Sequence, residues 1–245
     1  MTLDKQTLAV LIPFYNEQSN LKHTLQLISD IEKKEDFKIY TILHDDNSTD
    51  NSIEIIEGFK KNSEINIILI SNSNENLGHG KSLIRLSKEC LNMNNIDFVL
   101  TMDSDIKLES GELLSLLSLK NEGLIIGKRN RFNDGFFRGG ITILLEVLFF
   151  ITLFRIWRDV NCPLRLYTFK NFNKIWSEIP SETTIPNIFS TKEALKQNIK
   201  VSRYKYKENL VGNNQGVTWG NKSLLKKYKK ILNFCFHAAK EFIKN

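Results

Sequence analysis

The carboxylates with the clearest chemical potential in this chain are those of Asp103 and Asp105, which follow an apolar run at 98–102. Side chains two residues apart on a strand point to the same side, so we expect both acids to face one ligand at the carboxyl end of a strand. Two convergent carboxylates repel each other unless a cation lies between them. A hard divalent ion such as Mg²⁺ or Mn²⁺, shared with a substrate diphosphate, fits that need. The alternative is an ordinary polar turn, which Asp and Ser commonly form.

Three further polar clusters stand where apolar runs end in the first half of the chain. They are Asn16–Glu17, Asp45–Asp46 and Gly78–Lys81. The runs before them, and before the Asp pair, cover residues 8–12, 37–43, 65–70 and 97–102. Continuous apolar runs of this length indicate strands buried on both faces of a parallel sheet. Ligands of such sheets bind outside the carboxyl ends of the strands, so the four clusters predict a nucleotide-type pocket.

Apolar residues at helical spacing fill the intervals between these strands. They are Leu21, Leu25 and Ile28, then Ile53, Ile56 and Phe59, then Leu83, Leu86 and Cys90. Strand–helix alternation with short connections predicts a right-handed, doubly wound α/β sheet. A length of 245 residues gives room for one domain, with or without an appended subdomain.

Cysteine usage and the polar start of the chain bear on its compartment. Cys90, Cys162 and Cys235 are an odd number without metal-ligand spacing, so we expect a reducing compartment and no disulfide framework. Residues 1–6 are polar and lead straight into a strand, so a secretory signal is not expected.

Two segments of the carboxyl-terminal half suit a membrane surface. Ile141–Phe154 is intensely apolar but shorter than the about 20 residues of a membrane span, so it is either a buried helix or a helix in the membrane interface. Residues 221–245 carry seven lysines, the single acid Glu241 and an apolar helical stripe. This pattern predicts a basic amphipathic helix, which either packs on the domain or attracts an anionic partner, lipid headgroups or nucleic acid. Of these two partners we expect the lipid.

Four segments occur in the order and spacing of family 2 glycosyltransferases, which the chain resembles. They are Val10–Glu17, Asp45–Asp50, Asn76–Gly80 and Met102–Asp105. Further on, Asp159–Tyr167 looks like the Asp-x-x-Cys-Gly-Phe-Arg-x-Tyr block of polyprenyl-phosphate sugar synthases, the dolichyl-phosphate mannose synthase group. The resemblance covers about residues 8–220 and implies a GT-A fold, a Rossmann-like doubly wound mixed sheet, in a single domain over 1–220. A donor half at about 8–107 and an acceptor half at about 108–220 would precede the 221–245 helix.

The resemblance also implies roles for individual residues. Nucleotide contacts fall to Pro13, Tyr15, Glu17, Asp46, Gly78 and Asp103, and the metal, Mg²⁺ or Mn²⁺, to Asp103 and Asp105. Acceptor contacts fall to Arg129, Arg138 and Arg165, and catalytic roles to Asp105, Arg129 and Asp159. A phosphate acceptor is already an anion and needs positioning, which guanidinium groups supply. A hydroxyl acceptor needs a general base, for which Asp159 or Glu208 is the candidate.

Three positions depart from the pattern of the polyprenyl group. Lys107 stands where a metal-binding Gln is common, and a protonated amine cannot ligate a cation. Pro163 replaces a Gly, and Asn209 stands where an Arg of an Arg-x-x-Gly-x-Ser pattern is expected. Diphosphate and water would then complete the metal shell, or Lys107 would supply part of its charge.

We therefore expect an inverting, metal-dependent glycosyltransferase that moves a sugar from UDP or GDP to polyprenyl phosphate or a lipid-linked acceptor. It would act as a peripheral protein of the cytoplasmic membrane face, without a nucleic acid partner. One alternative is transfer to a glycan or protein hydroxyl in surface polysaccharide assembly. Another is a degenerate member that binds nucleotide or membrane without turnover.

Overall fold

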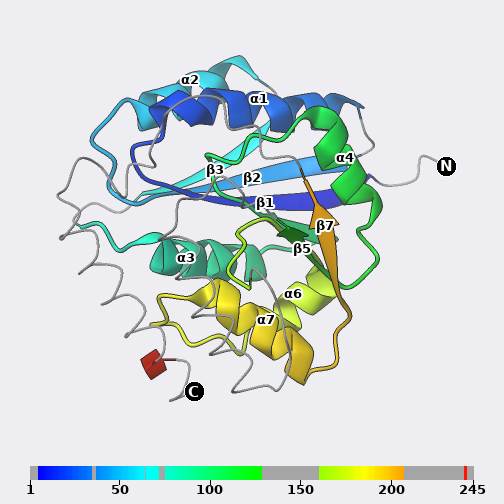
Figure 1. Cartoon of the computed structure of the whole chain (residues 1–245). Coiled ribbons are helices and arrows are strands. Elements are labelled where there is room, and N and C mark those ends of the chain that lie inside the picture. The colour runs from blue at the N-terminus through cyan, green and yellow to red at the C-terminus, as the bar shows by residue number, and fades with distance from the viewer. Residues whose placement is uncertain are drawn as a thin grey trace.

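A computed structural model describes residues 5–34, 37–63, 65–71, 75–128, 160–206 and 240–241. Strands and helices alternate through most of these ranges (Figure 1). In chain order they are β1 (Gln6–Phe14), α1 (Gln18–Lys34), β2 (Phe37–Asp45), α2 (Ser52–Asn62), β3 (Asn66–Ser71), α3 (His79–Leu91), β4 (Phe98–Thr101), α4 (Ser110–Ser118), β5 (Leu124–Lys128), β6 (Arg165–Thr168), α6 (Phe169–Trp176), α7 (Pro186–Lys196) and β7 (Val201–Lys205).

The strands form one mixed sheet in the order β3-β2-β1-β4-β6-β5-β7. β1 pairs in parallel with β2 and β4, and β2 pairs in parallel with β3. β6 runs antiparallel to both β4 and β5, and β7 is parallel to β5. The chain winds outward from β1 to β3 and returns on the other side of β1 as β4, which places a topological switch point between β1 and β4. The predicted doubly wound mixed α/β sheet is confirmed.

Helices cover both faces of this sheet. α1, α2 and α4 lie on one face and α3, α6 and α7 on the other (Figure 1). β1 is buried from Thr7 to Phe14, as expected of a central strand covered on both sides. The helices turn their periodic apolar residues to the sheet: α1 buries Leu21, Leu25 and Ile28, and α3 buries Leu83, Leu86 and Cys90. The sequence predicted both apolar faces.

The described elements β6, α6, α7 and β7 were not predicted, and neither was α4. β6 follows from the segment recognised only as a motif, and its four residues, Arg165–Thr168, lack a continuous apolar run. α6 begins where Thr168 caps it, because the Thr168 hydroxyl accepts a hydrogen bond from the amide of Asn171 at 3.2 Å. None of the helices in the described part of the chain is long and apolar enough to cross a membrane.

Cys90 and Cys162 are buried. Burial, with a smaller contribution from the charge of Glu89, raises the pKa of the Cys90 thiol to about 12. The thiol is therefore neutral at physiological pH and packs as a small apolar group.

Candidate active site

The loop after β1 and the loop after β2 are joined by hydrogen bonds. The amide of Asn16 donates to Ser48 Oγ at 2.9 Å, and Asn16 Oδ1 accepts from the amide of Thr49 at 2.7 Å. The amide of Glu17 donates to Ser52 Oγ at 3.0 Å. Asn16 has φ 54°, a left-handed conformation that Asn adopts more readily than most residues. These bonds make one unit of two loops that are more than thirty residues apart in sequence.

Asp46 attaches a third loop, the one before α3, to this unit. Its carboxylate is buried and accepts hydrogen bonds from the amides of Leu77 at 2.7 Å and Gly78 at 2.8 Å. Its carbonyl oxygen accepts from Asn76 Nδ2 at 3.0 Å. Gly78 has φ 86°, a backbone conformation that favours glycine. No atom lies within 4 Å of the position of an added Cβ, so glycine is not needed there for lack of space. Asp46 thus positions the loop, and its carboxylate has lone pairs left for a further donor.

Asp103 follows β4, and one of its carboxylate oxygens accepts no hydrogen bond. Oδ1 is buried without a hydrogen bond. Its neighbour is His79 Nδ1 at 3.6 Å, a distance for an ion pair with protonated His79 but too long for a hydrogen bond. The turn itself is fixed to α1, because Thr24 Oγ1 donates to the carbonyl of buried Ser104 at 2.9 Å. A carboxylate oxygen kept from water without a donor is poised for a cation.

Asp103 and Asp105 do not lie on a strand, contrary to the prediction. β4 ends at Thr101, so Asp103 and Asp105 lie in the turn that follows and the alternation of a strand does not govern them. Asp103 is partly buried and Asp105 is exposed. Both acids still lie in the same short turn after β4, with one residue between them. Their carboxylates could therefore bind one cation from different sides.

Glu17 adds negative charge to this region. Burial raises the pKa of its carboxyl, and the charges of Asp103 and Asp50 raise it further. A 2.6 Å hydrogen bond from Asn20 Nδ2 to Glu17 Oε2 opposes these effects. The acids of the β1 and β4 loops therefore repel one another, and a cation would relieve that repulsion.

A divalent cation fits these residues only with ligands from elsewhere. The described ranges hold no group of three or more His, Cys, Asp and Glu side chains that converges on one metal position. Asp103 and Asp105 supply two carboxylates, which is usual for Mg²⁺ bound together with substrate phosphates and water. The donor set thus fits a metal that arrives with a diphosphate.

Pro13 and Tyr15 flank the same edge of the sheet. Pro13 is buried in β1 opposite His44 of β2. Tyr15 comes directly after the strand, and its side chain is 37% exposed. Among the described residues it is the large apolar side chain that lies exposed. An exposed aromatic ring at the carboxyl ends of the strands offers a face on which a nucleobase could stack.

Arg165, predicted to contact the acceptor, is fully buried at the start of β6. The guanidinium donates to the carbonyls of Cys162 and Val160 and to the hydroxyls of Ser190 and Thr191, the last two at 2.9 Å. These bonds fix the 160–164 turn and α7 to the sheet, so Arg165 has a structural role. Its contact with the acceptor stays a prediction.

Several sequence predictions lie outside the described residues. They concern Arg129, Arg138, Asp159, Glu208, Asn209, Ile141–Phe154 and most of 221–245. The described donor half therefore brings together the clusters after β1, β2, β3 and β4, whereas the acceptor side is represented by Arg165 alone.

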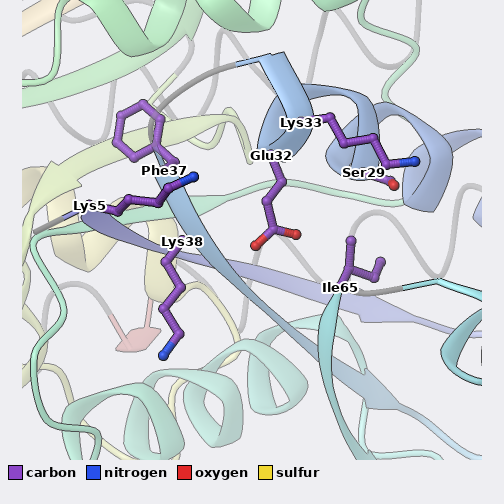
Figure 2. A pocket seen from close by; sticks show the side chains of 7 residues that line it. All are labelled: Lys5, Ser29, Glu32, Lys33, Phe37, Lys38 and Ile65. Carbon is purple, nitrogen blue, oxygen red and sulfur yellow. The ribbon is translucent and has the colours of Figure 1, made fainter. Parts of the chain in front are cut away.

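A cavity of about 510 Å³ lies at the opposite end of the strands (Figure 2). Phe37 and Lys38 begin β2, Lys5 precedes β1 and Ile65 precedes β3, while the last turns of α1 form the remaining wall. The cavity is thus at the amino ends of the parallel strands, away from Asp103, and is separate from the candidate site.

The model of the family described as glycosyl transferase family 2 matches residues 9–176, more than half of the chain. The chain belongs to glycosyl transferase family 2. The match spans the loops after β1, β2, β3 and β4 together with β6 and α6.

Relatives of this family 2 chain extend the comparison. An uncharacterized protein of Methanocaldococcus jannaschii is 30% identical over 166 residues, which are 64% of this chain and 69% of that protein. An undecaprenyl-phosphate 4-deoxy-4-formamido-L-arabinose transferase of Proteus mirabilis is 29% identical over 161 residues. That match covers 65% of this chain, which spans only 48% of the transferase.

Solved structures of low identity share the fold. Glucosyl-3-phosphoglycerate synthase of Mycobacterium tuberculosis, in complex with Mn²⁺, UDP and glucosyl-3-phosphoglycerate, matches with a TM-score of 0.63 and 14% identity over 97% of this chain and 80% of that one. TarS of S. aureus in complex with UDP-GlcNAc matches with a TM-score of 0.57 and 16% identity over 94% of this chain and 65% of the other. The family 2 chain therefore has the predicted GT-A fold.

Two contacts of the candidate site were not predicted from the sequence. One is made by Asp46, which was expected to contact the nucleotide and also accepts hydrogen bonds from the Leu77 and Gly78 amides. The other is made by His79, although a histidine between Gly78 and Gly80 at the start of a helix is an unusual polar residue at the expected ligand edge.

Proposed function

We propose that this family 2 glycosyltransferase moves a sugar from a UDP or GDP donor to polyprenyl phosphate or another lipid-linked acceptor. The observation that carries the proposal is the joined unit of three loops around Asp103, whose buried Oδ1 has no hydrogen-bond partner. The relatives named undecaprenyl-phosphate sugar transferases support the acceptor class. Complexes of GT-A proteins with UDP and Mn²⁺ support the donor and the metal.

The donor nucleotide would bind at the carboxyl ends of β1 and β2. Exposed Tyr15 would stack on the base, with buried Pro13 fixing the strand end before it. Glu17 would accept from the ribose or base. Asp46 would hold Gly78 so that the backbone of its loop comes close to the ligand.

Asp103 and Asp105 would hold the metal, Mg²⁺ or Mn²⁺. When bound, the ion neutralises the charge that develops on the leaving diphosphate. A hydrogen bond from Thr24 to the carbonyl of Ser104 holds the backbone of the Asp103 turn in place before a ligand binds. Preorganised groups of this kind need no rearrangement during the reaction.

The acceptor would bind on the side formed by residues 129–159. Arg129 and Arg138 would hold its phosphate through bidentate hydrogen bonds. A phosphate monoester attacks the anomeric carbon without a general base, so positioning supplies most of the rate. Asp159 would take a proton only from a hydroxyl acceptor.

The basic residues 221–245 would bring the enzyme to the anionic cytoplasmic face of the membrane, where its acceptor resides. Seven lysines against one acid attract anionic headgroups, and that attraction weakens as salt screens the charges. Co-sedimentation with anionic vesicles at low salt, lost at high salt and with neutral vesicles, is the expected result. Equal binding to neutral vesicles would remove this part of the proposal.

A two-stage experiment tests the reaction. Thermal stabilisation by UDP and GDP, each with and without Mn²⁺, identifies the nucleotide, because a ligand of the native state raises its stability. Membrane extract is then incubated with the matching labelled nucleotide sugars and wild-type enzyme, with Asp105→Asn as the control for contaminating activity. Lipid-extractable label that mild acid releases supports transfer to a lipid phosphate. Acid-stable label indicates transfer to a hydroxyl, and no transferred label from any donor refutes the function.

A further inference from the structure

The turn before α7 packs directly on the first turn of α3. A Cβ added to Gly80 would lie 2.4 Å from the carbonyl oxygen of Thr184, so only glycine permits this approach. Beside it, Lys81 Nζ lies 3.3 Å from Glu182 Oε2. The close approach at Gly80 is therefore made by the 182–185 turn.

Glu241 holds the same turn from the carboxyl-terminal end of the chain. Its carboxylate accepts hydrogen bonds from Thr183 Oγ1 at 2.8 Å, from the Thr184 amide at 3.1 Å and from Thr184 Oγ1 at 2.9 Å. We call Glu241 with Thr183 and Thr184 the C-terminal latch. Hydrogen bonds to an ionised carboxylate are stronger than those between neutral groups, and here three converge on one side chain.

The first turn of α3 connects the latch to the candidate donor site. Gly78, which precedes α3, is bound by Asp46, and His79 faces Asp103 at 3.6 Å. Gly80 is the next residue and contacts Thr184. Residues 78–80 therefore link Asp46, Asp103 and the latch. A shift of the turn before α7 moves the same helical turn that the donor site uses.

We propose that Glu241 is a positioning residue of the donor site, acting through the turn at Thr183–Thr184 and the first turn of α3. The role of α3 in donor binding rests on the proposed function, whereas the mechanical link does not. Glu241 is also the single acid among residues 222–245, which carry seven lysines. The latch therefore ties Glu241, which stands in a basic stretch of sequence, to the turn that packs on the first turn of α3.

Glu241→Ala tests the latch, and Lys240→Ala is the matched control. Lys240 is the exposed neighbour of Glu241. Lys240→Ala also removes one charge and introduces alanine at this place in the chain, but it leaves the latch intact. Thr184→Val is a second variant, which removes one hydroxyl donor and keeps the shape of the side chain. Affinity for UDP and GDP with Mn²⁺ is measured by calorimetry. Hydrogen exchange of the 77–84 amides is measured without nucleotide.

We expect Glu241→Ala to weaken nucleotide affinity by about tenfold, a typical size for coupling between two sites, and to speed exchange over 77–84. Thr184→Val should do the same to a smaller extent, and Lys240→Ala should match wild type. Loss of the three hydrogen bonds should also lower the unfolding temperature of Glu241→Ala, so affinity and exchange are measured well below it. These changes together support the latch.

Exchange and affinity in Glu241→Ala equal to those in Lys240→Ala would overturn the latch. A wild-type protein that binds neither nucleotide, with faster exchange in Glu241→Ala, would refute the proposed donor and leave the latch standing. Weaker nucleotide binding with unchanged exchange would overturn the route through α3.

Discussion

The carboxylate of Asp46 accepts a 2.8 Å hydrogen bond from the backbone amide of Gly78. Its other oxygen accepts from the amide of Leu77 at 2.7 Å. One buried side chain thus fixes the loop before α3 against the loop after β2, across more than thirty residues of sequence. Gly78, with φ 86°, takes a conformation that presents its amide to Asp46.

Asp46→Asn should therefore lower both stability and nucleotide affinity. An amide side chain has one acceptor oxygen, so one of the two backbone amides loses its partner. We expect a loss of about 1–3 kcal/mol in the free energy of unfolding, measured by urea titration. Glu57→Gln, the same acid-to-amide change on α2, is the control and should match wild type. Weaker nucleotide binding at unchanged stability would mean that Asp46 acts only as a ligand contact.

Asp103→Asn should separate function from stability. The substitution removes a charge that raises the pKa of Glu17, so the protein without metal should be as stable as wild type or more so. Activity should fall by about 100-fold or more, because a bound metal contributes several kcal/mol to the transition state. Thermal unfolding in EDTA measures the first effect, and turnover with readded Mn²⁺ the second.

Wild-type protein treated with EDTA and then given Mn²⁺ is the control for Asp103→Asn and should recover full activity. Mn²⁺-dependent binding of UDP or GDP that is equal in Asp103→Asn and wild type would contradict the metal role of Asp103.

Arg165→Lys should destabilise the protein severely. A lysine amine has three donors at one point and cannot reach the four oxygens that the guanidinium bonds, including those of Cys162 and Ser190. Disrupting a buried charge that makes four hydrogen bonds costs about 3–5 kcal/mol, which chemical denaturation would measure. Lys170→Arg on α6, an exposed exchange of the same two residue types, should be neutral. A soluble, stable Arg165→Lys with lost transfer would support the predicted acceptor role instead.

The donor half could be predicted well because strands of a parallel sheet that are covered on both faces have a simple apolar pattern. Apolar runs buried on both faces fix the direction of β1, β2 and β4, and their carboxyl ends carry the polar clusters to one edge. The boundaries were less certain: β2 extends to Asp45, and β4 stops at Thr101 before the Asp pair. A strand and a turn differ there by one or two backbone hydrogen bonds, which apolar patterning does not specify.

The later part of the fold depends on partners that no local pattern reveals. β6 reads Arg-Leu-Tyr-Thr, and its place between β4 and β5 follows from pairing with distant strands. Arg165 looks like a surface cation in sequence. Two of the four acceptors that compensate its burial, the hydroxyls of Ser190 and Thr191, come from α7, more than twenty residues further along the chain.

Gly80→Ala and Gly58→Ala form a matched pair, since both glycines lie in helices. At Gly80 the new methyl group would lie 2.4 Å from the Thr184 carbonyl, and backbone must move to admit it. We expect a loss of about 1–3 kcal/mol in stability, as for other overpacked sites, together with weaker nucleotide binding. At Gly58 nothing lies within 4 Å of the added atom, so alanine should stabilise α2 by about 0.5–1 kcal/mol.

Urea titration of both variants, with UDP and GDP binding in the presence of Mn²⁺, measures this contrast. Helix propensity alone would favour alanine at both positions, so opposite signs isolate the contact between Gly80 and Thr184. If Gly80→Ala were as stabilising as Gly58→Ala and bound nucleotide normally, the turn before α7 would have room to move away from α3 without affecting the donor site. The packing of that turn would then not constrain the residues around Asp103.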